Sequence, residues 1–120
     1  MRRRGQTEHS KIQCAIVKGC DYHPEARKIL HVPNEGKMSE IAGAILNKEG
    51  RRKGVFDLHL PLARGGFHAM WMEVKIPGDD LTAEQRIFME QVKRDGCHAI
   101  VVWTSQEGID AVLNYLKGEK

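Results

Sequence analysis

The sequence lacks several features that would place it in large classes of protein. None of its apolar runs approaches the ~18 consecutive residues that a membrane-spanning helix needs. The first ten residues, MRRRGQTEHS, begin with basic side chains but have no apolar stretch after them, so we expect no secretory signal. The chain has only three cysteines, an odd number that favours free thiols in a reducing compartment. We therefore expect a cytoplasmic protein without a membrane segment.

Internal repeats and low-complexity linkers are also missing. A chain of 120 residues without them is expected to fold as one domain, over residues 1–120, with residues 1–6 flexible. The charge is only mildly basic, at +3, which is too weak by itself to indicate a nucleic-acid partner. Two local basic clusters are more informative, because residues 2–4 (RRR) and 51–53 (RRK) have the charge needed to contact phosphates. Solvated loops are the alternative explanation of both clusters.

Hydrophobic periodicity and capping signals predict alternating helices and strands. Thr7 is a helix cap and Gly19 a helix stop, while Thr82 with Gln85 and Thr104 with Glu107 fit two capping boxes. The expected helices span about residues 8–18, 38–49, 83–95 and 105–116. The expected strands span about residues 28–32, 55–60, 67–76 and 98–103, the last being typical of a strand buried on both faces. This order predicts an α/β fold with a mixed central sheet flanked by helices and one parallel crossover over residues 83–103.

Three charged residues interrupt the most strand-like segment, GVFDLHLPLARGGFHAMWMEVKI at positions 54–76. Burying an unpaired charge is costly, so these residues require an explanation. Strand alternation places Glu73 and Lys75 on one face, and Asp57 comes alongside if the two strands pair as a hairpin. Two carboxylates beside a lysine suit a Mg²⁺ ion that also contacts a substrate phosphate. A simple ion pair at a strand end is the competing explanation.

An acid-x-Lys triplet is weak support by itself. Charged residues are common enough for such a triplet to arise about once per 100–200 residues. This chain contains a second one, Glu35-Gly36-Lys37, in a predicted turn. The strand context and the neighbouring acid give the triplet at 73–75 its weight.

Other candidate sites are less favoured. A zinc site is disfavoured because the spacing of its four potential ligands is unusual; these ligands are Cys14, Cys20, His23 and His31. The histidines nearest to the proposed carboxylates, His59 and His68, are expected at strand ends or on the surface. Trp71 and Trp103 lie in predicted strands and are expected in the core rather than as stacking platforms for bases.

The order of several motifs resembles the virus-type replication-repair nuclease (VRR-NUC) domain of the PD-(D/E)XK nuclease superfamily. The resemblance covers nearly the whole chain, with Phe56 standing where the superfamily name has proline. The motifs that carry it are Glu8, Gln13, Pro33-Asn34, KEGRRKGVFDLHLP at 48–61, Glu73-Val74-Lys75, Leu81-Thr82, Gln85, Gly96 and Tyr115. The fold that it implies is a restriction-endonuclease-like α/β core.

The resemblance also implies roles for individual residues in a metal-dependent phosphodiesterase. Asp57 and Glu73 would bind Mg²⁺ or Mn²⁺, together with the backbone carbonyl of Val74. Lys75 would act on the water nucleophile. These roles agree with the interpretation of the same residues from strand alternation.

Further positions match the family outside the strands. Glu8 matches an acid of the first helix that reaches the metal or its water, with a solvated helix-start acid as the alternative. Gln85 matches a polar position behind the active strand, and its capping role is compatible with this. The basic residues 51–53, namely Arg51, Arg52 and Lys53, and Arg64 lie in loops beside the two strands and are expected to contact DNA phosphates.

Small stand-alone proteins of this kind resemble phage-encoded enzymes that cut branched DNA. The implied function is a structure-selective DNA endonuclease that resolves four-way Holliday junctions as a homodimer. The implied location is the cytoplasm, which is the cytoplasm of the host cell if the protein is phage-encoded. Symmetrical cutting needs two sites, and a dimer supplies them to a short chain. The alternatives are a less selective DNA nuclease and a non-catalytic module that binds or organises junctions.

Overall fold

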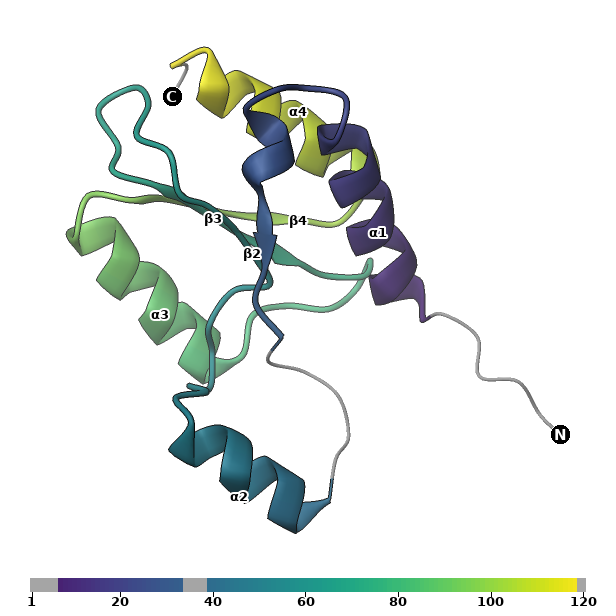
Figure 1. Cartoon of the computed structure of the whole chain (residues 1–120), viewed down its shortest axis with the longest axis vertical. Coiled ribbons are helices and arrows are strands. Elements are labelled where there is room, and N and C mark those ends of the chain that lie inside the picture. Colours follow the sequence, from purple (N-terminus) through teal and green to yellow (C-terminus); the bar gives the residue numbers. More distant parts are fainter. Residues whose placement is uncertain (1–6, 34–38, 119–120) are drawn as a thin grey trace, which may run out of the picture.

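The computed structural model describes residues 7–33 and 39–118. The predicted helices and strands all appear in it, with a 3₁₀ turn before the first strand (Figure 1). The helices are α1 (Glu8–Cys20), α2 (Glu40–Lys48), α3 (Ala83–Arg94) and α4 (Ser105–Leu116), and the turn is η1 (Ala26–Lys28). The strands are β1 (Leu30–His31), β2 (Leu58–Leu60), β3 (Met70–Val74) and β4 (His98–Val102). The segments 1–6 and 34–38, which include the second acid-x-Lys triplet, lie outside the described residues.

The four strands form one mixed sheet in the order β1-β2-β3-β4. The pairs β1–β2 and β2–β3 are antiparallel, whereas β3 and β4 are parallel and are joined through α3, which confirms the predicted crossover. Strand β4 is at the edge of the sheet, and only Ala99 and Val102 within it are buried. These two residues lie on opposite faces of the sheet, because Ala99 pairs with Trp71 and Val102 with Val74, and α3 and α4 both contact the strand. The expectation that both faces are covered is therefore supported, although the remaining residues of this edge strand are only half-buried.

The helices cover the two faces of the sheet unequally. On one face α1 and α4 pack against β3, whose Met70, Met72 and Val74 belong to the main core (Figure 1). On the other face α3 packs against the alternate residues of β3, with the rings of Trp71 and Phe88 in edge contact at 4.9 Å. Helix α2 has no buried residues and extends away from the sheet in Figure 1. The site therefore has to be sought around β3, where helices approach from both sides.

Local signals placed most helix ends correctly. Both predicted capping boxes are present, at Thr82 with Gln85 and at Thr104 with Glu107. The expectation for Gly19 was wrong, because α1 continues through it to Cys20. A side chain at Gly19 would overlap Ile109 of α4, so this glycine permits two helices to approach closely rather than ending one. No described helix has the length and apolar character needed to cross a membrane.

Candidate active site

The two acids of the predicted site meet at one end of the sheet. Leu58 of β2 pairs with Met72 of β3, and extending that register by one residue places Asp57 opposite Glu73. The backbone N–H of Asp57 donates a hydrogen bond to Oε1 of Glu73 at 3.2 Å, and the N–H of Val74 donates to Oδ2 of Asp57 at 3.0 Å. Both side chains are buried, with 2% of Asp57 and none of Glu73 exposed. The hairpin therefore brings two buried carboxylates together, as strand alternation predicted.

Gln85 and Lys75 contact the buried carboxylate of Glu73. The side-chain Nε2 of Gln85 donates to Oε2 of Glu73 at 2.9 Å, while its own Oε1 accepts a hydrogen bond from the backbone N–H of Thr82. One glutamine thus caps α3 and fixes the orientation of Glu73. The Nζ atom of Lys75 lies 3.7 Å from the same Oε2, and the lysine side chain is mostly buried. The sequence analysis left open whether Gln85 caps the helix or belongs to the site, and its contacts serve both.

A glycine sets the path of the chain into Asp57. Gly54 has a φ of +86°, and a side chain on it would overlap the backbone of Glu84 in the first turn of α3. The segment that leads into β2 is therefore held close to the helix that carries Gln85. Only glycine combines this backbone conformation with so close an approach.

His9 is a member of the site that the sequence analysis missed. Its Nε2 lies 3.0 Å from Oδ2 of Asp57, at the start of α1. The signal in the sequence was helical spacing, since His9 precedes the buried Ile12 and Ile16 by three and seven residues and so lies on the inner face of α1. Sequence reasoning had considered His59 and His68 as the nearest histidines. His59 instead stacks on Trp71, with ring centroids 3.9 Å apart.

The donor atoms around Asp57 fit a divalent cation. One ligand atom each from His9, Asp57 and Glu73 lie within 4.8 Å of one another, and this is the only such group found among residues 7–33 and 39–118. Carboxylate oxygens suit Mg²⁺ and Mn²⁺, and an imidazole nitrogen is also acceptable to Mn²⁺. Two buried carboxylates held side by side repel one another, and a cation between them would relieve that repulsion.

The potential zinc ligands are not brought together in the part of the chain that the structure describes. Cys14 is exposed, and Cys20 is buried at the last residue of α1. Burial, reinforced by the nearby carboxylate of Asp21, raises the pKa of the Cys20 thiol to about 11. A thiol in that state is a poor zinc ligand, because the metal binds the thiolate.

The other predicted site residues, Glu8 and the basic residues 51–53, lie beside the carboxylates or in the loop that leads to them. Glu8 is exposed and lines, with Lys75, a hollow of about 220 Å³ beside the site. Arg51, Arg52 and Lys53 lie in the loop between α2 and Asp57, and Arg51 donates to the side chain of Asn47 at 3.0 Å. Their roles, and that of the Val74 carbonyl, stay predictions.

Arg64 lies away from this group of residues. It is in the turn between β2 and β3, at the end of the hairpin opposite to Asp57 and Glu73. Its guanidinium forms an ion pair with Glu25. The structure therefore does not bring Arg64 together with the carboxylates, although loop position alone had suggested that it flanks them.

Comparisons with known proteins identify the family and the fold. The model of the VRR-NUC domain family matches residues 1–106. A solved structure described as a VRR_NUC domain protein superimposes with a TM-score of 0.80 at 23% sequence identity, covering 98% of this chain and 93% of the other. At that identity the likeness is one of fold. No curated protein matches the chain. Its fold is a restriction-endonuclease-like α/β core. Since the family model covers most of the sequence, the chain belongs to the VRR-NUC domain family, and this membership implies a nuclease-type function.

Proposed function

We propose that the protein is a Mg²⁺- or Mn²⁺-dependent endonuclease that hydrolyses phosphodiester bonds in branched DNA. The observation that carries this proposal is the pair of buried carboxylates, Asp57 and Glu73, with Lys75 beside Glu73. A simple ion pair accounts for one acid and the lysine. His9 lies 3.0 Å from the second acid, but neither contact explains why two buried carboxylates are held next to each other.

The residues of the site have complementary tasks in this proposal. Asp57 and Glu73 would hold the cation, and His9 supplies a nitrogen within reach of both. When bound, such a cation neutralises charge on the phosphate and makes water a better nucleophile at neutral pH. Gln85 and the N–H of Val74 fix the two carboxylates by hydrogen bonds, so little reorganisation is needed when substrate arrives.

Lys75 is the residue for which we propose the direct role in catalysis. Its ammonium group lies near Glu73 and borders the hollow that also contains Glu8. From there it would orient the attacking water or neutralise the negative charge that develops on the phosphate. Glu8 would assist by accepting a hydrogen bond from the same water.

Branched DNA is the proposed substrate, and a homodimer is the proposed assembly for cutting four-way junctions. One site per chain cuts one strand, so symmetrical resolution requires two copies. The apolar side chains exposed on α2, which include Ile41 and Ile45, support an association of this kind. A helix of nine residues is marginally stable without a partner surface. Sedimentation of the protein with and without junction DNA would measure the assembly.

A cleavage assay on several DNA structures tests the proposed activity. Labelled duplex, flap and four-way-junction DNA are incubated with the protein while Mg²⁺ or Mn²⁺ is titrated. Lys75→Ala should lower the cleavage rate by about 10²- to 10⁴-fold, the usual contribution of a group that assists proton transfer. DNA affinity should be nearly unchanged. Lys93→Ala, at the far end of α3, is the matched control and should cleave normally.

Each alternative gives a different result in this assay. Full activity of Lys75→Ala would contradict the proposed mechanism. Tight binding without cleavage on every substrate would favour the non-catalytic junction-binding module. Equal cleavage rates on duplex and branched DNA would indicate the less selective nuclease.

A further inference from the structure

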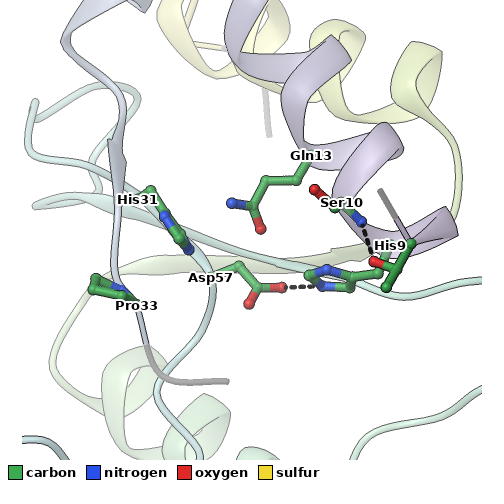
Figure 2. A pocket seen from close by; sticks show the side chains of 7 residues that line it. His9, Ser10, Gln13, His31, Pro33 and Asp57 are labelled. Carbon is green, nitrogen blue, oxygen red and sulfur yellow. Dashed lines mark hydrogen bonds and ion pairs between the residues drawn. The ribbon is translucent and has the colours of Figure 1, made fainter. Parts of the chain in front are cut away.

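A cavity extends from His9 and Asp57 to residues that have no task in the proposed chemistry. Its volume is about 470 Å³, and α1 and the end of β1 form its walls (Figure 2). It shares Thr7 and His9 with the hollow that contains Lys75, and it shares Gln13 and His31 with a further hollow along α1. The seven lining residues are Thr7, His9, Ser10, Gln13, His31, Pro33 and Asp57. A depression therefore begins at the predicted catalytic lysine, passes the carboxylate and continues beyond it.

Gln13 presents an unused hydrogen-bonding group to this cavity. Its side chain extends from α1 into the space between His31 and Asp57 (Figure 2). Its Oε1 is the only buried side-chain nitrogen or oxygen among the described residues that has no hydrogen-bond partner. A buried acceptor is costly to keep without a partner, so this oxygen calls for one, which a ligand or a water in the cavity can supply. The carboxamide offers both donors and an acceptor, which is the pattern needed to read the edge of a base.

The opposite wall offers surfaces on which a flat ring can lie. His31 and Pro33 are both exposed, and the imidazole of His31 faces the cavity from β1 (Figure 2). Histidine is one of the side chains on which unstacked bases are placed in nucleic-acid complexes. A ring lying on His31 would have its edge within the space that the carboxamide of Gln13 enters.

The charge of the lining differs between its two ends. A cation held by Asp57 and His9 would attract a phosphate at that end, next to the bond that is cleaved. At the end formed by Gln13 and His31 the described lining has no lysine or arginine, so a phosphate would find no permanent positive charge there. A neutral base and its sugar need no such charge, and the volume is in the range of sites for small ligands.

We propose that this cavity receives an unpaired nucleobase next to the phosphodiester that is cleaved at Asp57 and Lys75. The inference rests on the proposed function and adds the reason for selecting branched DNA. In a continuous duplex the base is paired and stacked, so reaching Gln13 requires extruding it against both interactions. At a branch or a single-stranded arm the base is already free to enter.

Abasic substitution of the DNA tests the cavity directly. A branched oligonucleotide is prepared with a single tetrahydrofuran abasic residue at each of the three positions on either side of the branch in turn. The dissociation constant is measured by fluorescence anisotropy in Ca²⁺, and cleavage is measured separately in Mg²⁺. Removing the base that enters the cavity should weaken binding by about 5- to 100-fold, the range expected for one stacked base. Abasic residues at the other positions should have little effect.

Variants of the lining residues then connect that base to the cavity. Gln13→Ala and His31→Ala should weaken binding of the intact DNA but cause no further loss on the DNA that lacks the critical base. His31→Phe should retain most of the affinity, because it preserves the ring surface. Gln91→Ala and His68→Ala replace exposed residues of the same types outside the cavity and should match the wild-type protein. Gln13→Met, which keeps the bulk of the side chain, covers the case in which the alanine variant folds poorly.

The outcomes separate this inference from the proposed nuclease activity. If no abasic position weakens binding, or if the losses from Gln13→Ala and from the missing base multiply, the cavity does not hold a base. In that case cleavage by the wild-type protein can still establish the nuclease. If the abasic pattern appears without any cleavage, the cavity is supported and the nuclease proposal fails.

Discussion

Replacing Gln85 by alanine tests whether this glutamine holds the catalytic carboxylate or only caps α3. Its Nε2 donates to Oε2 of Glu73 at 2.9 Å, and its Oε1 accepts from the backbone N–H of Thr82 at 2.9 Å. Glu73 is fully buried, and a hydrogen bond to a charged group contributes about 1.5–3 kcal/mol. Losing the capping interaction costs about a further 1 kcal/mol. We expect Gln85→Ala to lower the free energy of unfolding by about 2.5–4 kcal/mol.

The second capping box provides an internal control. Glu107 occupies the same position in α4 and accepts from the backbone N–H groups of Thr104 at 3.0 Å and Trp103 at 2.9 Å, in an exposed setting. Glu107→Ala should therefore cost about 1–2 kcal/mol, the value of a cap with one further exposed hydrogen bond. The excess loss in Gln85→Ala is then a lower limit for the buried hydrogen bond to Glu73. Gln85→Glu keeps an acceptor for Thr82 but removes the donor, so it should be destabilised although α3 stays capped.

Urea unfolding followed by tryptophan fluorescence, at neutral pH in EDTA, measures these differences. The chelator is needed because a cation bound to Glu73 would offset part of the lost hydrogen bond. If Gln85→Ala loses no more stability than Glu107→Ala, the buried hydrogen bond to Glu73 contributes no more than the exposed one from Trp103, and the proposed role of Gln85 in holding Glu73 is refuted. Cleavage assays on the same variants should then show no loss specific to Gln85.

Three further predictions concern the approach to the site, its metal and its pH response. Gly54→Ala should destabilise the fold and reduce cleavage much more than Gly50→Ala. Both glycines have positive φ, but only a side chain at Gly54 overlaps the backbone of α3. Equal shifts of the melting temperature in the two variants would show that this contact is unimportant. Mg²⁺ or Mn²⁺ should raise the melting temperature of the wild-type protein but not that of Asp57→Asn. Asp80→Asn, which changes an exposed acid, is the control and should respond like the wild-type protein. Equal shifts in all three proteins would show that the ion does not bind at Asp57. Burial lowers the pKa of His59, so the unfolded state binds more protons than the folded state. The stability due to this residue is complete above a pH of about 6.5 and is lost as the pH falls. Urea midpoints measured between pH 8 and 5 should therefore decline less steeply for His59→Gln than for the wild-type protein.

Most of the fold followed from local patterns in the sequence. The capping boxes at Thr82 and Thr104 fixed where α3 and α4 begin, since a cap depends only on residues within one turn. Strand alternation also identified Glu73 and Lys75 as neighbours on one face of β3. The same reasoning was wrong about Gly19, because a glycine that allows two helices to touch looks the same in the sequence as one that ends a helix. The role of Gly19 as a close helix contact depends on Ile109, which is ninety residues away in the sequence.

The sequence by itself therefore determined the two acids, the lysine and the strands that carry them, because period-two alternation and short hairpins act over neighbouring residues. Only the tertiary structure decided that His9 joins Asp57 and that Gln13 and His31 face one cavity. Both relations depend on how α1 packs on the face of the sheet. That placement comes from burying Ile12, Ile16 and Cys20 against β3 and α4, and no local pattern records it.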